Sequence, residues 1–214
     1  MNRWLLAALA LASAAACGGG SNGGTAGGAP SGTLFGTAFT AADSASAVAG
    51  PTSCTFPQFG GVSASVAALV IGFGDQAGLC ASVQQPCALK PNGRTVTLVV
   101  ARAGLQAQGP IGPATYPITT GTPTPDASGV VTFATAAATR LDASCGEAPG
   151  APAPTGGTVT VTSVSGTSVR GTVDVTFSDG GRIGGAFDAP VCQVAFDVCA
   201  QQVPACSTTP TCHP

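Results

Sequence analysis

One alternating stretch in the second half of the chain restricts its fold more than any other feature. Residues 169–177 read Val-Arg-Gly-Thr-Val-Asp-Val-Thr-Phe, which separates apolar from polar side chains. This period of two is that of a β-strand with one buried face and one face in water. The Ser-Asp-Gly-Gly sequence at 178–181 predicts a tight turn, because glycine adopts positive φ without steric cost. Residues 182–188 then return as the partner strand, and 158–162 precede them with the same alternation.

Similar patterns recur along the chain and predict an all-β fold. Run 66–73 is apolar on both faces and is expected to be a central strand, and one or two helical turns are expected within 75–85. Eight or nine short strands with Gly- and Pro-rich breaks indicate an antiparallel sandwich or a small barrel. The strands expected besides the three above lie at 34–40, 66–73, 95–102, 115–119, 130–140 and 192–198.

Cysteines are expected to brace this fold as disulfides. The side chains of the body are mostly small, and each buries little area at about 25 cal/mol per Å². A disulfide adds roughly 2–4 kcal/mol by restricting the unfolded chain, and it forms in an oxidising compartment. We expect Cys145 to pair with Cys192 and Cys80 with Cys87, while the other four join the front loop and the C-terminal tail. The candidates are Cys54, Cys80, Cys87, Cys145, Cys192, Cys199, Cys206 and Cys212.

A metal site is the alternative use of these cysteines. Four of them follow one another at steps of seven, seven and six residues from 192 to 212, and His213 is adjacent. Structural zinc sites usually contain two close Cys-x2–4-Cys pairs, and this spacing contains none. We therefore expect disulfides, with no metal and no cofactor.

The first residues have the pattern of an export signal. Arg3 precedes a mostly apolar stretch at 4–16, which is shorter than the roughly 20 residues of a membrane-spanning helix but suits a signal peptide. The stretch ends in Ala-Ala-Ala-Cys at 14–17. Here the chain resembles bacterial lipoprotein precursors, whose lipobox places small residues before a cysteine that becomes the lipidated N-terminus. The usual lipobox has Leu where this chain has Ala14. The resemblance implies a fatty acid such as palmitate on Cys17.

The cysteine count agrees with lipidation. Nine is odd, and a lipid on Cys17 leaves eight that can pair completely. Cleavage without lipidation would instead leave Cys17 as a bare N-terminal thiol. The predicted organisation is a signal peptide at 1–16, lipidated Cys17 and a Gly-rich tether at 17–32, an antiparallel β domain at 33–198, and a Cys-rich tail at 199–214.

Charge and motifs exclude several functions. Seven Lys and Arg against nine Asp and Glu provide no basic footprint for nucleic acid. Lys90 and His213 are the single residues of their types, which removes P-loop and most histidine chemistry. A G-x-S-x-G string at 19–23 lies in the tether without the strand and helix that such a nucleophile needs. The carboxylate pairs Asp142 with Glu147 and Asp174 with Asp188 are candidates for a hydrolase.

The whole pattern resembles uncharacterised lipoproteins of Gram-negative bacteria with high-GC genomes. In such lipoproteins Gly18 after the cysteine implies the outer membrane, and the resemblance brings no catalytic residues. We expect a non-enzymatic module of the cell envelope, structural or binding, anchored to the membrane by its lipid. Its expected partner class is an envelope protein or polysaccharide. The alternatives are a lipocalin-like carrier of a small apolar ligand, which needs an internal cavity, and a carboxylate-dependent envelope hydrolase.

Overall fold

The computed structural model describes residues 29–56, 61–84, 88–193, 198–199 and 211–212. Cys17 and its tether, Cys87 and Cys206 lie outside the described residues. The elements are β1 (Ser31–Leu34), β2 (Thr37–Thr40), β3 (Asp43–Phe56), β4 (Val62–Gly74), α1 (Leu79–Gln84), β5 (Ala88–Leu89), β6 (Arg94–Gly104), β7 (Ala114–Pro117), β8 (Val131–Arg140), β9 (Pro154–Val164), β10 (Ser168–Phe177), β11 (Arg182–Pro190) and β12 (Thr211–Cys212).

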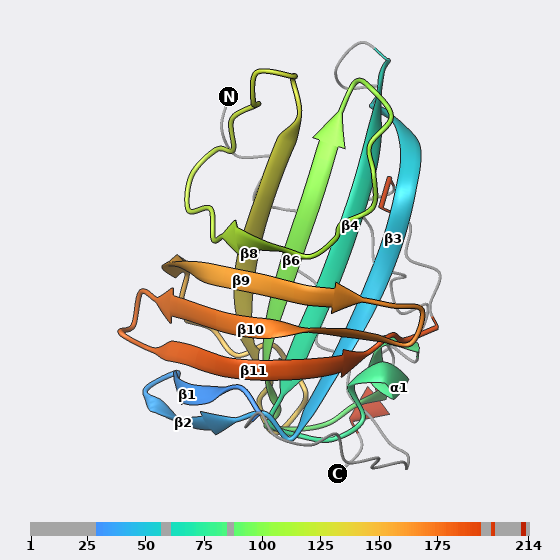
Figure 1. Cartoon of the computed structure of the whole chain (residues 1–214). Helices are drawn as coiled ribbons and strands as arrows, with labels where there is room; N and C mark the ends of the chain where they lie inside the picture. Colours follow the sequence, from blue (N-terminus) through green and yellow to red (C-terminus); the bar gives the residue numbers. More distant parts are fainter. Residues whose placement is uncertain (1–28, 57–60, 85–87, 194–197, 200–210, 213–214) are drawn as a thin grey trace.

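Two antiparallel sheets form a sandwich. Sheet A has the strand order β2-β1-β11-β10-β9-β7, and sheet B has the order β3-β4-β6-β8. The strands of sheet A cross those of sheet B steeply (Figure 1), as in orthogonally packed sheets. Bridges between Ser46 and Val191 and between Ile118 and Ala134 join the sheets at two corners without closing a barrel. The fold is therefore the predicted all-β sandwich and not the barrel.

The core lies between the sheets and follows from the alternation in the strands. In β10, Val169, Val175 and their inward neighbours are buried, while Arg170 and Thr172 are exposed. Sheet B contributes the opposing layer, and the rings of Phe73 and Phe187 meet across the interface with centroids 5.5 Å apart. The predicted central strand is confirmed, because β4 lies between β3 and β6.

Some predicted strands differ from the structure. Stretch 34–40 is not one strand but the turn and second strand of the β1–β2 hairpin, because Phe35 (φ 53°) and Gly36 (φ 69°) reverse the chain. Strand β3 was not predicted, since its Ala- and Ser-rich sequence has little β propensity and is held by pairing with β4. The predicted strand 192–198 is absent at its described residues, because the chain leaves sheet A after Pro190 and residues 198–199 form a turn.

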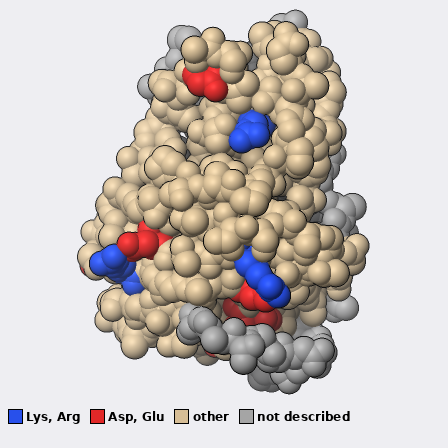
Figure 2. Space-filling model, in the orientation of Figure 1, with Lys and Arg blue, Asp and Glu red and all other residues tan. Residues whose placement is uncertain are grey.

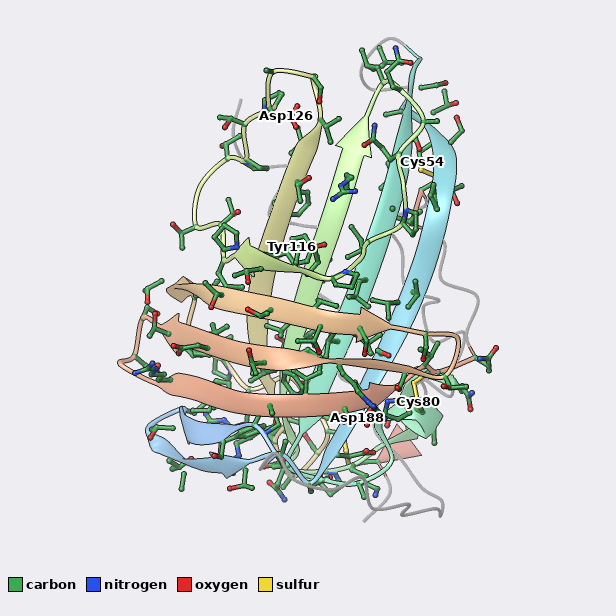
Figure 3. The ribbon with its side chains drawn as sticks, in the orientation of Figure 1. Cys54, Cys80, Tyr116, Asp126 and Asp188 are labelled. Atoms are coloured by element: carbon green, nitrogen blue, oxygen red, sulfur yellow. A yellow bond between two sulfur atoms is a disulfide. The ribbon has the colours of Figure 1, made fainter. Side chains whose placement is uncertain are left out.

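Three disulfides between described cysteines join segments that are far apart in sequence. Cys54 bonds Cys199, Cys80 bonds Cys192, and Cys145 bonds Cys212, with sequence separations of 145, 112 and 67 residues. Figure 3 shows Cys54 near the upper end of sheet B and Cys80 in α1 at the lower end. Two of the three bonds fix tail residues to the β domain.

Both expected pairings, Cys145 with Cys192 and Cys80 with Cys87, are wrong. Beyond β11, the backbone N–H of Cys192 donates to the Ser46 carbonyl of β3 at 2.7 Å. Helix α1 packs against the same end of β3, so Cys192 meets Cys80 beside Ala45. Cys145 lies in the turn after β8 and is bonded to β12 instead. The spatial neighbours of a cysteine depended on strand order, which spacing along the chain does not reveal.

Candidate binding face on the outer side of sheet A

The outer face of sheet A is rich in hydroxyl groups. Because side chains alternate along a strand, the valines of β9 and β10 enter the core and the threonines between them face outward. Thr115 and Thr160 on neighbouring strands are hydrogen-bonded at 3.0 Å, and Thr155 donates to Thr176 at 3.0 Å. The outward threonines are Thr33, Thr115, Thr158, Thr160, Thr162, Thr172 and Thr176.

Two arginine–aspartate pairs carry the charges of this face. Arg182 holds Asp174 through two hydrogen bonds, Nε to Oδ1 at 2.7 Å and Nη2 to Oδ2 at 2.6 Å. Arg170 Nε donates to Asp188 Oδ2 at 2.8 Å. The hydrogen bond from Arg182 lowers the pKa of Asp174, and the same contact raises the pKa of Arg182. Both pairs are solvent-exposed, so they organise polar groups while adding little stability.

A shallow depression of about 490 Å³ lies beside the first of these pairs. A Cβ atom at Gly184 would meet only the Val173 carbonyl oxygen within 4 Å, at 3.6 Å. A side chain would therefore fit there, and its absence leaves the surface hollow. In Figure 2 charged side chains on this side of the molecule are few and widely separated by uncharged surface. The depression is lined by Ser31, Thr33, Asp174, Arg182, Gly184 and Gly185, among others.

The structure does not bring Asp174 and Asp188 together as a catalytic pair. Asp174 lies opposite Gly184 and Asp188 lies opposite Arg170, four positions apart along the hairpin. At about 3.4 Å per residue this is roughly 13 Å, beyond the separations typical of glycosidases. Each carboxylate is also hydrogen-bonded to its own arginine.

The Asp142 carboxylate likewise accepts hydrogen bonds from residues of the turn that follows it. Its Oδ1 accepts hydrogen bonds from the Ser144 backbone and hydroxyl, at 2.8 and 2.7 Å, and from the Gly146 N–H at 2.9 Å. These bonds, that of the hydroxyl first, lower the pKa of Asp142. Glu147 forms an isolated antiparallel β-bridge with Leu141 through its backbone. The second candidate pair thus forms a loop rather than a cleft.

Among the described residues, no three or more His, Cys, Asp or Glu side chains gather where they could hold a metal ion. In the same part of the chain, no helix has the length and apolarity to cross a bilayer.

Sequence reasoning missed the depression, although a signal for it exists. Gly184 and Gly185 stand together inside a strand, and glycine in a strand often marks a place where something approaches the backbone closely. The alternation assigned Arg170, Thr172, Asp174 and Thr176 to the water-facing side, and the structure confirms this.

Comparison with family models, with curated proteins and with solved structures finds no match to this chain.

Proposed function

We propose that this protein is an exported, lipid-anchored module of the cell envelope that binds a partner without catalysis. The three disulfides carry the proposal, since they link segments 67 to 145 residues apart and such bonds persist in oxidising compartments. Cys17 follows the signal-like segment and receives the lipid, which leaves the other eight of the nine cysteines to form disulfides.

The position of the first described residues fits an anchored domain. The Pro30 carbonyl accepts a hydrogen bond from the Ala41 N–H at 2.9 Å, so the chain is fixed to the fold just before β1. The proposed tether thus reaches the domain at sheet A. Ser31 and Thr33, its direct continuation, line the depression.

The outer face of sheet A is the proposed binding face, and an envelope polysaccharide is the proposed partner. Threonine hydroxyls donate and accept hydrogen bonds, and each arginine–aspartate pair offers both donors and acceptors without net charge. This surface matches a neutral partner rich in hydroxyl groups. No observation on the described residues favours the carrier or the hydrolase over this function.

Mass spectrometry of the mature protein under non-reducing conditions tests the anchoring. We expect loss of residues 1–16, acyl chains on Cys17 and no thiol open to alkylation. A soluble form that starts at Met1 and has reduced thiols would overturn the proposal.

Affinity electrophoresis in gels with dextran, β-glucan or galactomannan tests the binding face. Gly184→Leu fills the depression, because a Cβ there meets no atom closer than 3.6 Å. Ala186→Leu is the matched control, since it places the same leucine side chain two residues along the outer side of β11. We expect retardation that Gly184→Leu abolishes and Ala186→Leu preserves. Equal retardation of both variants, or none of the wild type in any gel, would contradict the assignment.

A further inference from the structure

The inner face of sheet B extends past sheet A, and Arg102 lies on this part. Along β6 the core-facing residues alternate, and Val96, Leu98 and Val100 are each 0% exposed. Arg102 is the next residue of this series and is half-buried. Figure 1 shows the upper parts of β4, β6 and β8 extending beyond β7 and β9. The connections 105–113 and 118–130 run on either side of them. A cation thus stands where the core pattern predicts an apolar residue.

Among the described cations, Arg102 differs from the others in having no direct partner. It makes no ion pair or hydrogen bond with any residue that the structure describes. Each of the other described cations has a partner: Arg94 pairs with Asp75, Arg170 with Asp188 and Arg182 with Asp174, Arg140 lies over the ring of Phe35, and Lys90 donates to the Ala77 carbonyl.

A second donor stands beside Arg102 on the same face. Thr132 of β8 is its cross-strand partner, and the Thr132 side chain is exposed. The Cβ atoms of such partners are about 4.5–5.5 Å apart, so their polar ends can reach one ligand group. On the other side the partner is Ala67, whose small side chain offers the guanidinium no polar group.

The connections close the upper end of this area. A Cβ atom at Gly104 would lie 2.6 Å from Gln108 Nε2 and 3.2 Å from Val130 Cγ2, so both connections reach β6 there. The Gln108 N–H donates to Ser65 Oγ at 3.0 Å, which fixes the first connection to β4. Both connections therefore reach β6 two residues beyond Arg102.

One carboxylate, that of Asp126, lies within electrostatic reach of Arg102. Asp126 Oδ1 accepts hydrogen bonds from the Ser128 backbone and hydroxyl and from the Val130 N–H, at 2.8, 2.6 and 3.0 Å. The pKa of Asp126 is lowered first by the Ser128 hydroxyl and, in smaller part, by the charge of Arg102. Figure 3 places Asp126 on the connection that rises to β8. Asp126 repels a dianion more strongly than a monoanion, so the site favours a singly charged ligand group.

We propose that Arg102 and Thr132 bind a carboxylate group of a ligand. The planar guanidinium can donate two parallel hydrogen bonds to a carboxylate, and the Thr132 hydroxyl can donate a third. This site is separate from the depression on sheet A and does not depend on it.

Titration of the oxidised, ¹⁵N-labelled protein with sodium glucuronate tests the proposal. Glucose and inorganic phosphate, at matched ionic strength, are the comparison probes. We expect glucuronate to shift the Arg102 Nε–Hε and Thr132 amide signals, phosphate to bind more weakly, and glucose to leave them unchanged. Arg102→Gln should weaken binding at least about tenfold, Thr132→Val about threefold, and Asp126→Asn should strengthen it about threefold.

Arg140→Gln is the matched control, because it removes the same charge from a strand of the same sheet. It should leave the affinity for glucuronate unchanged. Arg102→Lys keeps the charge but loses the planar guanidinium, so we expect an intermediate affinity for glucuronate. If Arg102→Gln does not fold, the affinity of Arg102→Lys tests the proposal in its place. Equal weakening by Arg140→Gln, wild-type affinity in Arg102→Gln or Arg102→Lys, or preference for phosphate would overturn the proposal.

Discussion

Arg94 and Arg140 face each other directly across β6 and β8, and each guanidinium lies over a phenylalanine ring of the β1–β2 hairpin. The Arg94 guanidinium carbon is 5.6 Å from the Phe39 ring centroid, and that of Arg140 is 5.1 Å from Phe35. Like charges on paired residues normally destabilise a sheet. Here the aromatic faces attract both cations, and this contact fixes a hairpin of sheet A to the end of sheet B.

Loss of Arg94 should cost more stability than loss of Arg140. Arg94 also donates to Asp75 Oδ2 at 2.7 Å, to Thr37 Oγ1 at 2.6 Å and to the Ala38 carbonyl at 2.9 Å. We expect Arg94→Ala to lower the free energy of unfolding by about 2 kcal/mol, and Arg140→Ala by about 0.5–1 kcal/mol. Urea denaturation under non-reducing conditions measures both. A larger loss in Arg140→Ala would show that the aromatic contact, rather than the polar network, holds the hairpin.

Gly157 is required by the close approach of β9 to β10. A Cβ atom there would stand 2.1 Å from the Asp174 carbonyl oxygen, and φ is +128°. We expect Gly157→Ala to cost about 3 kcal/mol or more, measured by the denaturation midpoint. Gly166→Ala is the control, because its Cβ meets no atom within 4 Å, and it should change stability by less than about 0.5 kcal/mol. Similar midpoints for the two variants would refute the steric explanation.

The bond between Cys80 and Cys192 should contribute about 2–4 kcal/mol. It closes a separation of 112 residues, and Cys192 is buried beside Ala45 and Leu79. We expect the double variant Cys80→Ser/Cys192→Ser to lose more stability than Cys145→Ser/Cys212→Ser. The second bond closes only 67 residues and includes the exposed Cys212. Thermal unfolding of the two oxidised double variants gives the comparison, and the reverse order would contradict it.

The turns at Asp126 and Asp142 should loosen in acid. The pKa of each carboxyl is lowered from its ordinary value of 3.8, chiefly by the serine hydroxyl two residues later. A lowered folded-state pKa stabilises the turn above the unfolded value, and this contribution disappears as pH falls through the folded pKa. Carboxyl ¹³C titration should therefore give midpoints below 3.8 for both.

Serine variants provide the control for these turns. Ser144→Ala should move the Asp142 midpoint up towards its ordinary value and leave Asp126 unchanged. A shift of both midpoints, or of neither, would mean that the hydroxyl is not the cause.

The residues that were predictable are those whose two sides face different surroundings. The β10–β11 hairpin buries Val175 and Ile183 on one side and has Asp174 and Arg182 on the other. Apolar and polar residues therefore alternate in its sequence, and this alternation predicts the strands. Strand β3 carries no such contrast, because its alanines and serines pack equally well in a turn and are held by pairing with β4. Strand β3 forms because β4 lies beside it, and the sequence of β3 alone does not predict this pairing.

The candidate sites were predictable only in outline. The water-facing side of β10 followed from alternation, but the depression required β1 beside β11, a contact between residues about 150 positions apart in the chain. Arg102 gave a usable signal, since it continues the inward series of Val96, Leu98 and Val100 as a charge. The predicted strand ends at this residue, so the prediction assigns Arg102 to neither face.

The placement of the disulfides decides how the domain would respond to force on a lipid anchor. Pulling at residue 29 acts first on the hydrogen bond from the Ala41 N–H to the Pro30 carbonyl and then on the three residue pairs that join β1 to β11. No described disulfide closes a loop around β1 or β2, and the first cysteine the force would meet is Cys54. Residues 31–53 could then be drawn out to about 80 Å before the bond from Cys54 to Cys199 bears the load. Under such a force, residues 31–53 would extend while the Cys54–Cys199 disulfide limits further unfolding.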